Sequence, residues 1–244
     1  MKKIIRYIIF IIIKKRRIDM KYPYFLMDKE IQTAPVVKLS GQPLIINLDE
    51  AMARELMSME GDSVKINDWF DKVIKESGKS WAMGSYLENR ELILSQYEHM
   101  SIGKRYYHLG IDICAPAGTP VYAPLLGVVE DADYEPGTGN YGGYVILRHE
   151  IGEVEPFYSL YGHMSLDSLP EKGSFIKAGE EVALIGDLQE NGGWNHHTHI
   201  QIITSKGKER GFFFKGYCSE SDLKEIEELC PNPMSLLTVG VNSL

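Results

Sequence analysis

Short runs of apolar and β-branched residues, separated by Gly and Pro, dominate residues 106–205. Strands of this length bounded by turn residues, with no helical pattern between them, are typical of an antiparallel sandwich or barrel-like sheet. The runs predict strands at Val121–Ala123, Leu126–Tyr134, Tyr144–Arg148, Phe157–Tyr161, Phe175–Ile176, Glu181–Ile185 and His199–Ile203.

Residues 44–100 show helical spacing instead, because their apolar residues recur every three or four positions. Asn47 or Asp49 can cap a first helix, and we expect Asn67 to cap a second helix that ends at Gly78. The expected apolar faces hold Met52, Leu56 and Met59 in the first helix and Trp69, Phe70, Val73 and Ile74 in the second, and a third helical stretch surrounds Tyr86–Leu94.

These changes of pattern divide the chain into four segments. A basic and apolar tail (1–19) precedes a mostly helical region (20–105), a β-sheet domain (106–205) and a C-terminal extension (206–244). The extension holds one predicted short helix, stopped by Pro231. The predicted fold class is mainly β: a small antiparallel sandwich or barrel-like core with a helical N-terminal extension and a short C-terminal helix.

Composition is ordinary for a globular protein, with 44% hydrophobic and 25% charged residues. The formal net charge is −8, and residues 1–19 carry seven Lys or Arg against one Asp, so the remaining chain is strongly acidic. Nucleic-acid binding depends on neutralising phosphates, so we expect no nucleic-acid partner. The three cysteines are scattered and form no CxxC pair, which argues against a disulfide framework and against a thiolate zinc site.

The tail carries an apolar block, Ile8–Ile13, followed by the basic run Lys14–Arg17 where a signal peptide would have its cleavage site. The block is too short to cross a membrane. Three interpretations stay open: a basic tail on a membrane surface, an unusual export signal, or a start of translation at Met20, which we favour. We accordingly expect a cytoplasmic protein, with the cell envelope as the alternative, and make no prediction of the oligomeric state.

Two groups of histidines have the spacing of a metal site. In His197-Thr198-His199, residues two apart on a strand point to the same side. His108 and Asp112 are four apart in an extended or bent segment, and even separations again favour one side. Imidazole nitrogens and carboxylate oxygens are zinc ligands, and three such ligands plus a water form the catalytic arrangement. The two groups together are also compatible with a chance set of polar residues on a solvated sheet face.

Four motifs that follow one another along the chain are more specific than the two histidine groups alone. Residues 108–112 (HLGID) are followed by a PxGTPV turn at 116–121, YGHMS at 161–165 and HTHIQI at 197–202. The combination resembles the lysostaphin/LytM-type zinc metalloendopeptidases, which are peptidoglycan DD-metallopeptidase-like enzymes. The resemblance implies a small antiparallel β domain with a metal in a groove.

The same resemblance implies a role for each site residue. His108, Asp112 and His199 would bind one zinc ion per chain. His197 would be the general base for a zinc-bound water, and His163 would orient that water or stabilise the oxyanion. His196 stands where Pro is usual and should face away from the metal, while His149 is expected to be structural and His99 exposed.

A narrower resemblance involves Trp81–Arg90, Gly192–Trp194 and the stretch from Cys218 to Pro233. It is similar to a subgroup of these domains fused to aminotransferases, which is not an evident group of secreted wall lysins. The implied function is hydrolysis of peptide bonds, with peptidoglycan-type peptides containing Gly or D-Ala as substrate. An intracellular hydrolase of small peptides or amides and a non-catalytic groove-binding regulator are the alternatives, and residues 44–100 could block the groove as a prosegment.

Overall fold

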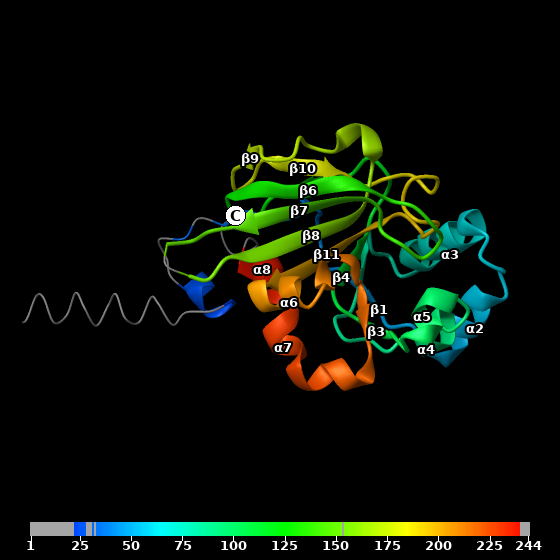
Figure 1. Ribbon diagram of the computed structural model, residues 1–244. Helices are drawn as coiled ribbons and strands as arrows, with labels where there is room; N and C mark the ends of the chain where they lie inside the picture. Colours follow the sequence, from blue (N-terminus) through cyan, green and yellow to red (C-terminus); the bar gives the residue numbers. More distant parts are fainter. Residues whose placement is uncertain (1–21, 28–30, 32, 153, 240–244) are drawn as a thin grey trace, which may run out of the picture.

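A central open sheet of eight strands organises the computed structural model, which describes residues 22–27, 31, 33–152 and 154–239 (Figure 1). Neighbouring strands are antiparallel except for the parallel pair β1 and β2. Across the sheet the order is β1 (Leu44–Ile46), β2 (Ala82–Gly84), β4 (Ile111–Cys114), β11 (His197–Thr204), β8 (Phe157–Met164), β7 (Gly142–His149), β6 (Gly127–Glu135) and β9 (Phe175–Ile176). Two-stranded ladders pair β5 (Pro120–Tyr122) with β10 (Glu181–Leu184) and β3 (Tyr107–His108) with β12 (Tyr217–Cys218).

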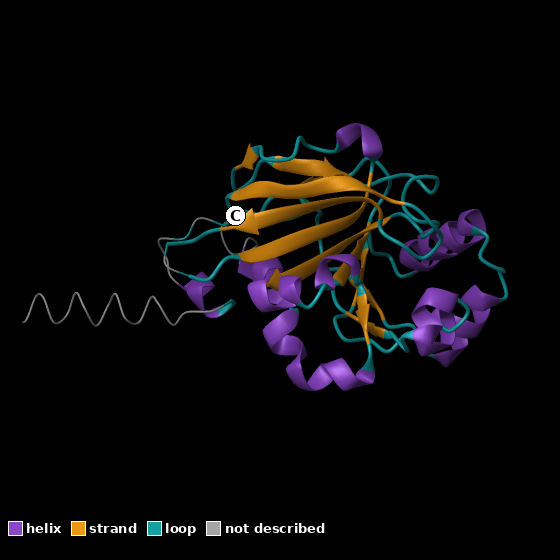
Figure 2. Cartoon of the chain, viewed as in Figure 1, coloured by secondary structure: helices purple, strands orange, loops and turns teal. Residues whose placement is uncertain are grey.

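The helices form two groups, one beyond an end of the long strands and one beside β11 (Figure 2). The first group lies beyond one end of the long strands and holds α2 (Glu50–Met57), α3 (Ser63–Glu76), α4 (Glu91–Leu94) and α5 (Glu98–Ile102). The second group follows β11 in the chain and holds α6 (Ser205–Glu209), α7 (Ile226–Leu229) and α8 (Met234–Val239). Short 3-10 turns are η1 (Tyr24–Met27), η2 (Leu166–Ser168), η3 (Phe212–Phe214) and η4 (Glu220–Glu225).

The prediction of a mainly β protein is confirmed, and each of the seven predicted strands is present within a few residues of its expected bounds. The sheet is not closed into a barrel, because its terminal strands β1 and β9 do not pair with each other. None of the described helices is long and apolar enough to span a membrane. The interpretations of residues 1–19 lie outside the described part of the chain and stay predictions.

The helix boundaries differ from expectation at Asn67. Asp49 caps α2 as predicted, with its carboxylate accepting from the Met52 N–H at 2.9 Å. Helix α3 instead begins four residues before Asn67, because the Asp62 carboxylate accepts from the backbone of its first turn. Asn67 is buried inside α3, and its side-chain oxygen accepts from the His196 N–H at 2.9 Å. A residue expected to cap a helix therefore ties that helix to the loop before β11.

Two further differences concern elements of the flanking regions. The stretch around residues 86–94 is helical only in α4, and the nearby strand β2 pairs with β4 and so brings the N-terminal region into the main sheet. Residues 219–230 form η4 followed by α7, which ends before Pro231 as expected, but α6 and α8 flank them as additional helices.

An apolar cluster fixes the first helical group against the sheet. Leu56 of α2 and Phe70 of α3 are buried against Ala82 of β2 and Cys114 of β4. Burial of large apolar side chains such as Leu56 and Phe70 contributes about 1.5–3 kcal/mol each to the free energy of unfolding. Because β4 also carries Asp112, the helices are held beside a predicted metal ligand.

Candidate active site

Strand pairing brings together three side chains that are far apart in the sequence. His199 of β11 lies opposite Asp112 of β4, and His108 ends the short strand β3 just before it. His108 Nε2 lies 2.9 Å from His199 Nδ1, and each of these nitrogens lies 3.1 Å from Asp112 Oδ1. All three side chains are buried. The predicted ligand set therefore converges on one point of the fold.

Gly110 allows this close approach. A Cβ at this position would stand 2.5 Å from His199 Cε1 and 2.6 Å from the Ile200 carbonyl oxygen, both too close for any side chain. The bend between β3 and β4 can therefore pass beside the His199 ring only because residue 110 has no side chain.

In His108 and His199, the ring nitrogen that points away from Asp112 makes a hydrogen bond of its own. These bonds determine which nitrogen of each ring faces inward, toward Asp112 Oδ1. His108 Nδ1 donates to the Ser85 carbonyl oxygen at 2.8 Å, and His199 Nε2 donates to Gln201 Oε1 at 3.0 Å. The Gln201 amide nitrogen faces the Lys215 carbonyl at 3.3 Å, so its oxygen is the atom turned to His199. A neutral imidazole has one N–H, so the inward nitrogens carry lone pairs.

Two lone pairs and a carboxylate oxygen thus converge, an arrangement that calls for a cation among them. Nitrogen and oxygen ligands lie roughly 2.0–2.2 Å from zinc, so a tetrahedral ion would space them about 3.3 Å apart. The observed separations of 2.9–3.1 Å are close to that value. The outer hydrogen bonds are also those expected around metal-binding histidines. The residues present fit one zinc ion.

Electrostatics keep the donors in their metal-binding protonation states. Burial, reinforced by the Arg90 charge, lowers the pKa of His108 to about 4. Burial alone would raise the pKa of Asp112, but the Arg90 guanidinium, which stays charged, holds that pKa well below its usual range. At neutral pH His108 is neutral and Asp112 is ionised, as metal binding requires.

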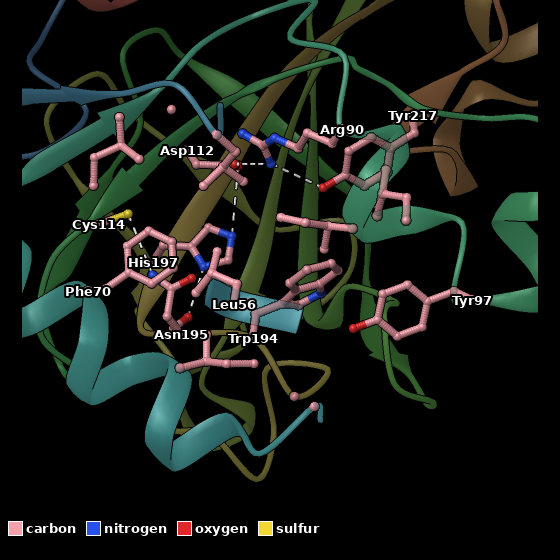
Figure 3. A pocket seen from close by; sticks show the side chains of 18 of the residues that line it. Leu56, Phe70, Arg90, Tyr97, Asp112, Cys114, Trp194, Asn195, His197 and Tyr217 are labelled. Carbon is pink, nitrogen blue, oxygen red and sulfur yellow. Dashed lines mark hydrogen bonds and ion pairs between the residues drawn. The ribbon is translucent and has the colours of Figure 1, made fainter. Parts of the chain in front are cut away.

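Arg90 is a site residue that the sequence did not reveal (Figure 3). Its guanidinium Nη1 donates to Asp112 Oδ2 at 2.7 Å and to the Tyr217 hydroxyl at 3.1 Å, while Nε donates to Glu88 Oε2 at 2.8 Å. The side chains in these ion pairs are only 8–10% exposed. We call the three converging atoms, His108 Nε2, Asp112 Oδ1 and His199 Nδ1, the ligand triangle. Arg90 therefore holds the carboxylate oxygen that points away from this triangle and leaves Oδ1 for the metal.

His163 and His197 lie beside the triangle, with ring centroids 4.3 Å apart. Each donates from Nδ1 to a backbone carbonyl at 2.8 Å, His163 to Asn191 and His197 to Asn195. Their Nε2 atoms are consequently unprotonated, and His197 Nε2 lies 3.8 Å from Asp112 Oδ1. Burial lowers the pKa of both rings.

The backbone of His163 adopts φ +65°, a left-handed conformation that is uncommon for a residue with a side chain. It lies at the end of β8, where the pairing with β7 shifts register. Its N–H donates to the Tyr141 carbonyl at 2.9 Å, and its own carbonyl accepts from the Gly186 N–H at 2.8 Å. Conformations of this kind concentrate at functional sites, where the surrounding structure holds them in place.

The remaining histidines lie outside the ligand triangle. His196 pairs with Asp187 at 3.1 Å, His149 is buried between the Leu126 carbonyl and Ser159, and His99 is exposed. A polar cleft opens over the site beside His163 and His199 and reaches His99 at its rim.

The segment that carries the candidate site is similar to known proteins. Residues 106–210 match the model of Peptidase family M23. This part of the chain is an M23 peptidase domain. All five predicted site residues lie within the M23 domain, whereas Arg90 and Tyr217 lie outside it on either side.

Several proteins are similar to the M23 domain. An uncharacterized metalloprotease of Haemophilus influenzae is 36% identical over 104 residues, which are 43% of this chain and 20% of that protein. The DD-carboxypeptidase/endopeptidase Mpg of Neisseria meningitidis is 36% identical over 95 residues, 39% of this chain and 20% of the relative. The chain thus matches about a fifth of each relative.

Among solved structures, the catalytic domain of the prophage-encoded M23 protein EnpA from Enterococcus faecalis is 28% identical. The alignment covers 41% of this chain and 69% of that one, with a TM-score of 0.34. The similarity to domains fused to aminotransferases stays a prediction, because none of these relatives bears on it.

Proposed function

We propose that this chain is a zinc-dependent endopeptidase whose single zinc ion is held by His108, Asp112 and His199. The observation that carries the proposal is the convergence of three acceptor atoms, each fixed by an outer hydrogen bond or ion pair, at separations of 2.9–3.1 Å. The match of residues 106–210 to the M23 family supports a hydrolase of peptide bonds.

A zinc ion bound there would lower the pKa of a water molecule and polarise the scissile carbonyl. His197 is the proposed general base, because its unprotonated Nε2 faces the site and its ring is fixed by the Asn195 carbonyl at 2.8 Å. A neutral imidazole can accept a proton from water and later donate it to the leaving amine.

His163 is proposed to orient the attacking water. Its Nδ1 hydrogen is committed to the Asn191 carbonyl, so Nε2 can accept a hydrogen bond from water but cannot donate one while the ring is neutral. Of the two roles implied by the sequence resemblance, this tautomer favours positioning of the water over stabilisation of an oxyanion.

Peptidoglycan-type peptides are the first substrate class to test, because a similar protein is named a DD-carboxypeptidase/endopeptidase. Small peptides or amides inside the cell are the second, favoured by the acidic chain outside residues 1–19. The presence of all five predicted side chains around one point supports a catalytic protein over a non-catalytic regulator. We propose a cytoplasmic location, with the cell envelope as the alternative, to be tested by fractionation.

The decisive experiment exposes the zinc-loaded full chain to purified muropeptides and, separately, to a mixture of plain peptides. Mass spectrometry of the products should find new amine termini that are absent with the His199→Ala variant. Cleavage of muropeptides supports the first substrate class, and cleavage of plain peptides alone supports the second. Absence of both, with one zinc per chain confirmed, would contradict the proposed function.

A further inference from the structure

A second pocket adjoins the polar cleft at the site, and Figure 3 shows the side chains that line it. Asp112 and His197 belong to both, so the pocket reaches the predicted ligand and the proposed base. Its walls are mostly apolar and include Leu56, Phe70 and Trp194. The space therefore adjoins the atoms at which a peptide bond would be cut.

We propose that this pocket binds a bulky apolar side chain, of the size of Leu or Phe, next to the bond that is hydrolysed. The inference rests on the proposed function and names the substrate class of the same site. Apolar side chains gain free energy roughly in proportion to the apolar area they bury, whereas Gly or Ala would leave most of the pocket unfilled.

The polar groups in the pocket wall support an apolar ligand. The Arg90 guanidinium is paired with Glu88 and Asp112, and the Asn195 side-chain amide contacts Cys114 Sγ at 3.6 Å. A charged substrate group would therefore lose its hydration without gaining a free partner from these residues.

The adjoining polar cleft makes the site asymmetric. Arg105, Glu135 and Asn140 line that cleft together with His163, so charged and hydrogen-bonding groups stand there beside Met100, Phe214 and the shared Trp194. A peptide that crosses the site would place its bulky apolar side chain on one flank of the scissile bond and its polar groups on the other.

The pocket is built largely by residues outside the M23 domain. Leu56 lies on α2, Phe70 on α3 and Ile93 on α4, all before residue 106. Among the described residues this helical group forms a wall of the pocket, and it does not fill the polar cleft. We therefore assign to it a role in substrate selection, where the sequence had suggested a blocking prosegment.

The test compares cleavage of acetylated peptides Gly-Gly-X-Gly-Gly-amide, with X as Gly, Ala, Leu or Phe, by the zinc-loaded full chain. We expect kcat/KM for Leu or Phe to exceed that for Gly by about tenfold or more, with cuts on one side of X. Ile66→Trp should fill the pocket from a half-buried position on α3 and reduce kcat/KM for the Leu and Phe peptides to about that for the Gly peptide.

Val64→Trp is the matched control, because Val64 is 57% exposed on the same helix and does not line the pocket. Equal cleavage of the Gly and Leu peptides would overturn the pocket assignment while sustaining the proposed function. Binding is measured separately with N-acetyl-leucinamide and N-acetylglycinamide by ligand-observed NMR. If neither these peptides nor the muropeptides are cut but the leucinamide binds, and Ile66→Trp prevents that binding, the pocket is supported and the hydrolytic function is contradicted. If neither occurs, both fail.

Discussion

At the scale of single residues, the side chains around the metal position divide into those that would bind it and those that would act on the substrate. His199 belongs to the ligand triangle, whereas His197 stands beside it with its Nε2 3.8 Å from Asp112 Oδ1. The two residues are on the same strand and face the same side, so their variants form a matched pair.

We expect His199→Ala to lose both bound zinc and peptidase activity, because it removes one of three protein ligands. His197→Ala should retain one zinc per chain and lose at least about a hundredfold in kcat, which is the contribution typical of a general base. Metal analysis of the purified variants together with product formation checks both. Near-normal turnover in His197→Ala would show that the assigned base is wrong.

Arg90 is expected to position Asp112 for the metal. Arg90→Leu removes the donor to Asp112 Oδ2 and should weaken zinc affinity by about 10- to 100-fold, the usual effect of losing a partner of a metal ligand. Arg90→Lys should recover part of that affinity, since it restores the charge but not the donor geometry. Competition with a chelating dye measures the change.

The control for this prediction is Arg54→Leu, which alters an exposed arginine on α2 that pairs with Glu50. If the Arg54 and Arg90 variants bind zinc equally well, Arg90 serves only the fold. Sequence alone could not identify Arg90, because its partner Asp112 is 22 positions away and Tyr217 is 127 positions away. Arg90 does end the Trp81–Arg90 stretch of the narrower resemblance, but that stretch implied no role for it, whereas the motifs around the five predicted residues implied a role for each.

At the scale of elements, the strand pair β4 and β11 determines whether the site can form. The bend at Gly110 passes so close to β11 that an added Cβ would meet the Ile200 carbonyl at 2.6 Å. That contact is with backbone, so relief requires the two strands to separate.

Gly110→Ala is accordingly expected to destabilise the fold by about 1–3 kcal/mol and to weaken zinc binding. Chemical denaturation and metal titration of the same preparation measure the two effects. Gly103→Ala, at a position with φ −86° whose nearest neighbour is the flexible Arg105 side chain, should change neither property appreciably. Wild-type zinc affinity in Gly110→Ala would show that the bend tolerates a side chain.

The elements that sequence patterns predicted well are those whose signal is local. Gly and Pro residues bound the strands between residues 120 and 185, and the Asp49 cap marks the start of α2. Strand β2 has three residues and β4 is buried along its whole length, so neither shows the alternation that reveals a half-buried strand. Asn67 was misplaced as a cap because its partner, the His196 N–H, comes from another part of the chain.

At the scale of the whole molecule, buried neutral histidines make stability depend on pH. His149, far from the ligand triangle, donates to the Leu126 carbonyl and lies 2.7 Å from Ser159 Oγ. Burial lowers its pKa from 6.5 to about 4. The unfolded chain therefore binds a proton between these values that the folded chain does not.

The free energy of unfolding should consequently fall as the pH drops from about 6.5 to about 4, by on the order of 3 kcal/mol from this residue. His149→Gln keeps polar groups at this position without titrating in that range, so its unfolding should take up about one proton fewer. Denaturation at a series of pH values compares the slopes. Identical slopes in the two proteins would contradict the prediction.

The separation of the three metal donors along the chain has a consequence for the stability of the folded protein. His108, Asp112 and His199 meet only when β4 and β11 are paired, so the unfolded chain offers no comparable set. Binding to the folded state alone adds stability as the logarithm of free metal concentration, about 2.7 kcal/mol at a hundred times the Kd. A chelator should then lower the Tm by about 5–10 °C in the wild type but leave His199→Ala unchanged. The fraction of folded molecules is therefore expected to rise and fall with the zinc supply, independently of any substrate.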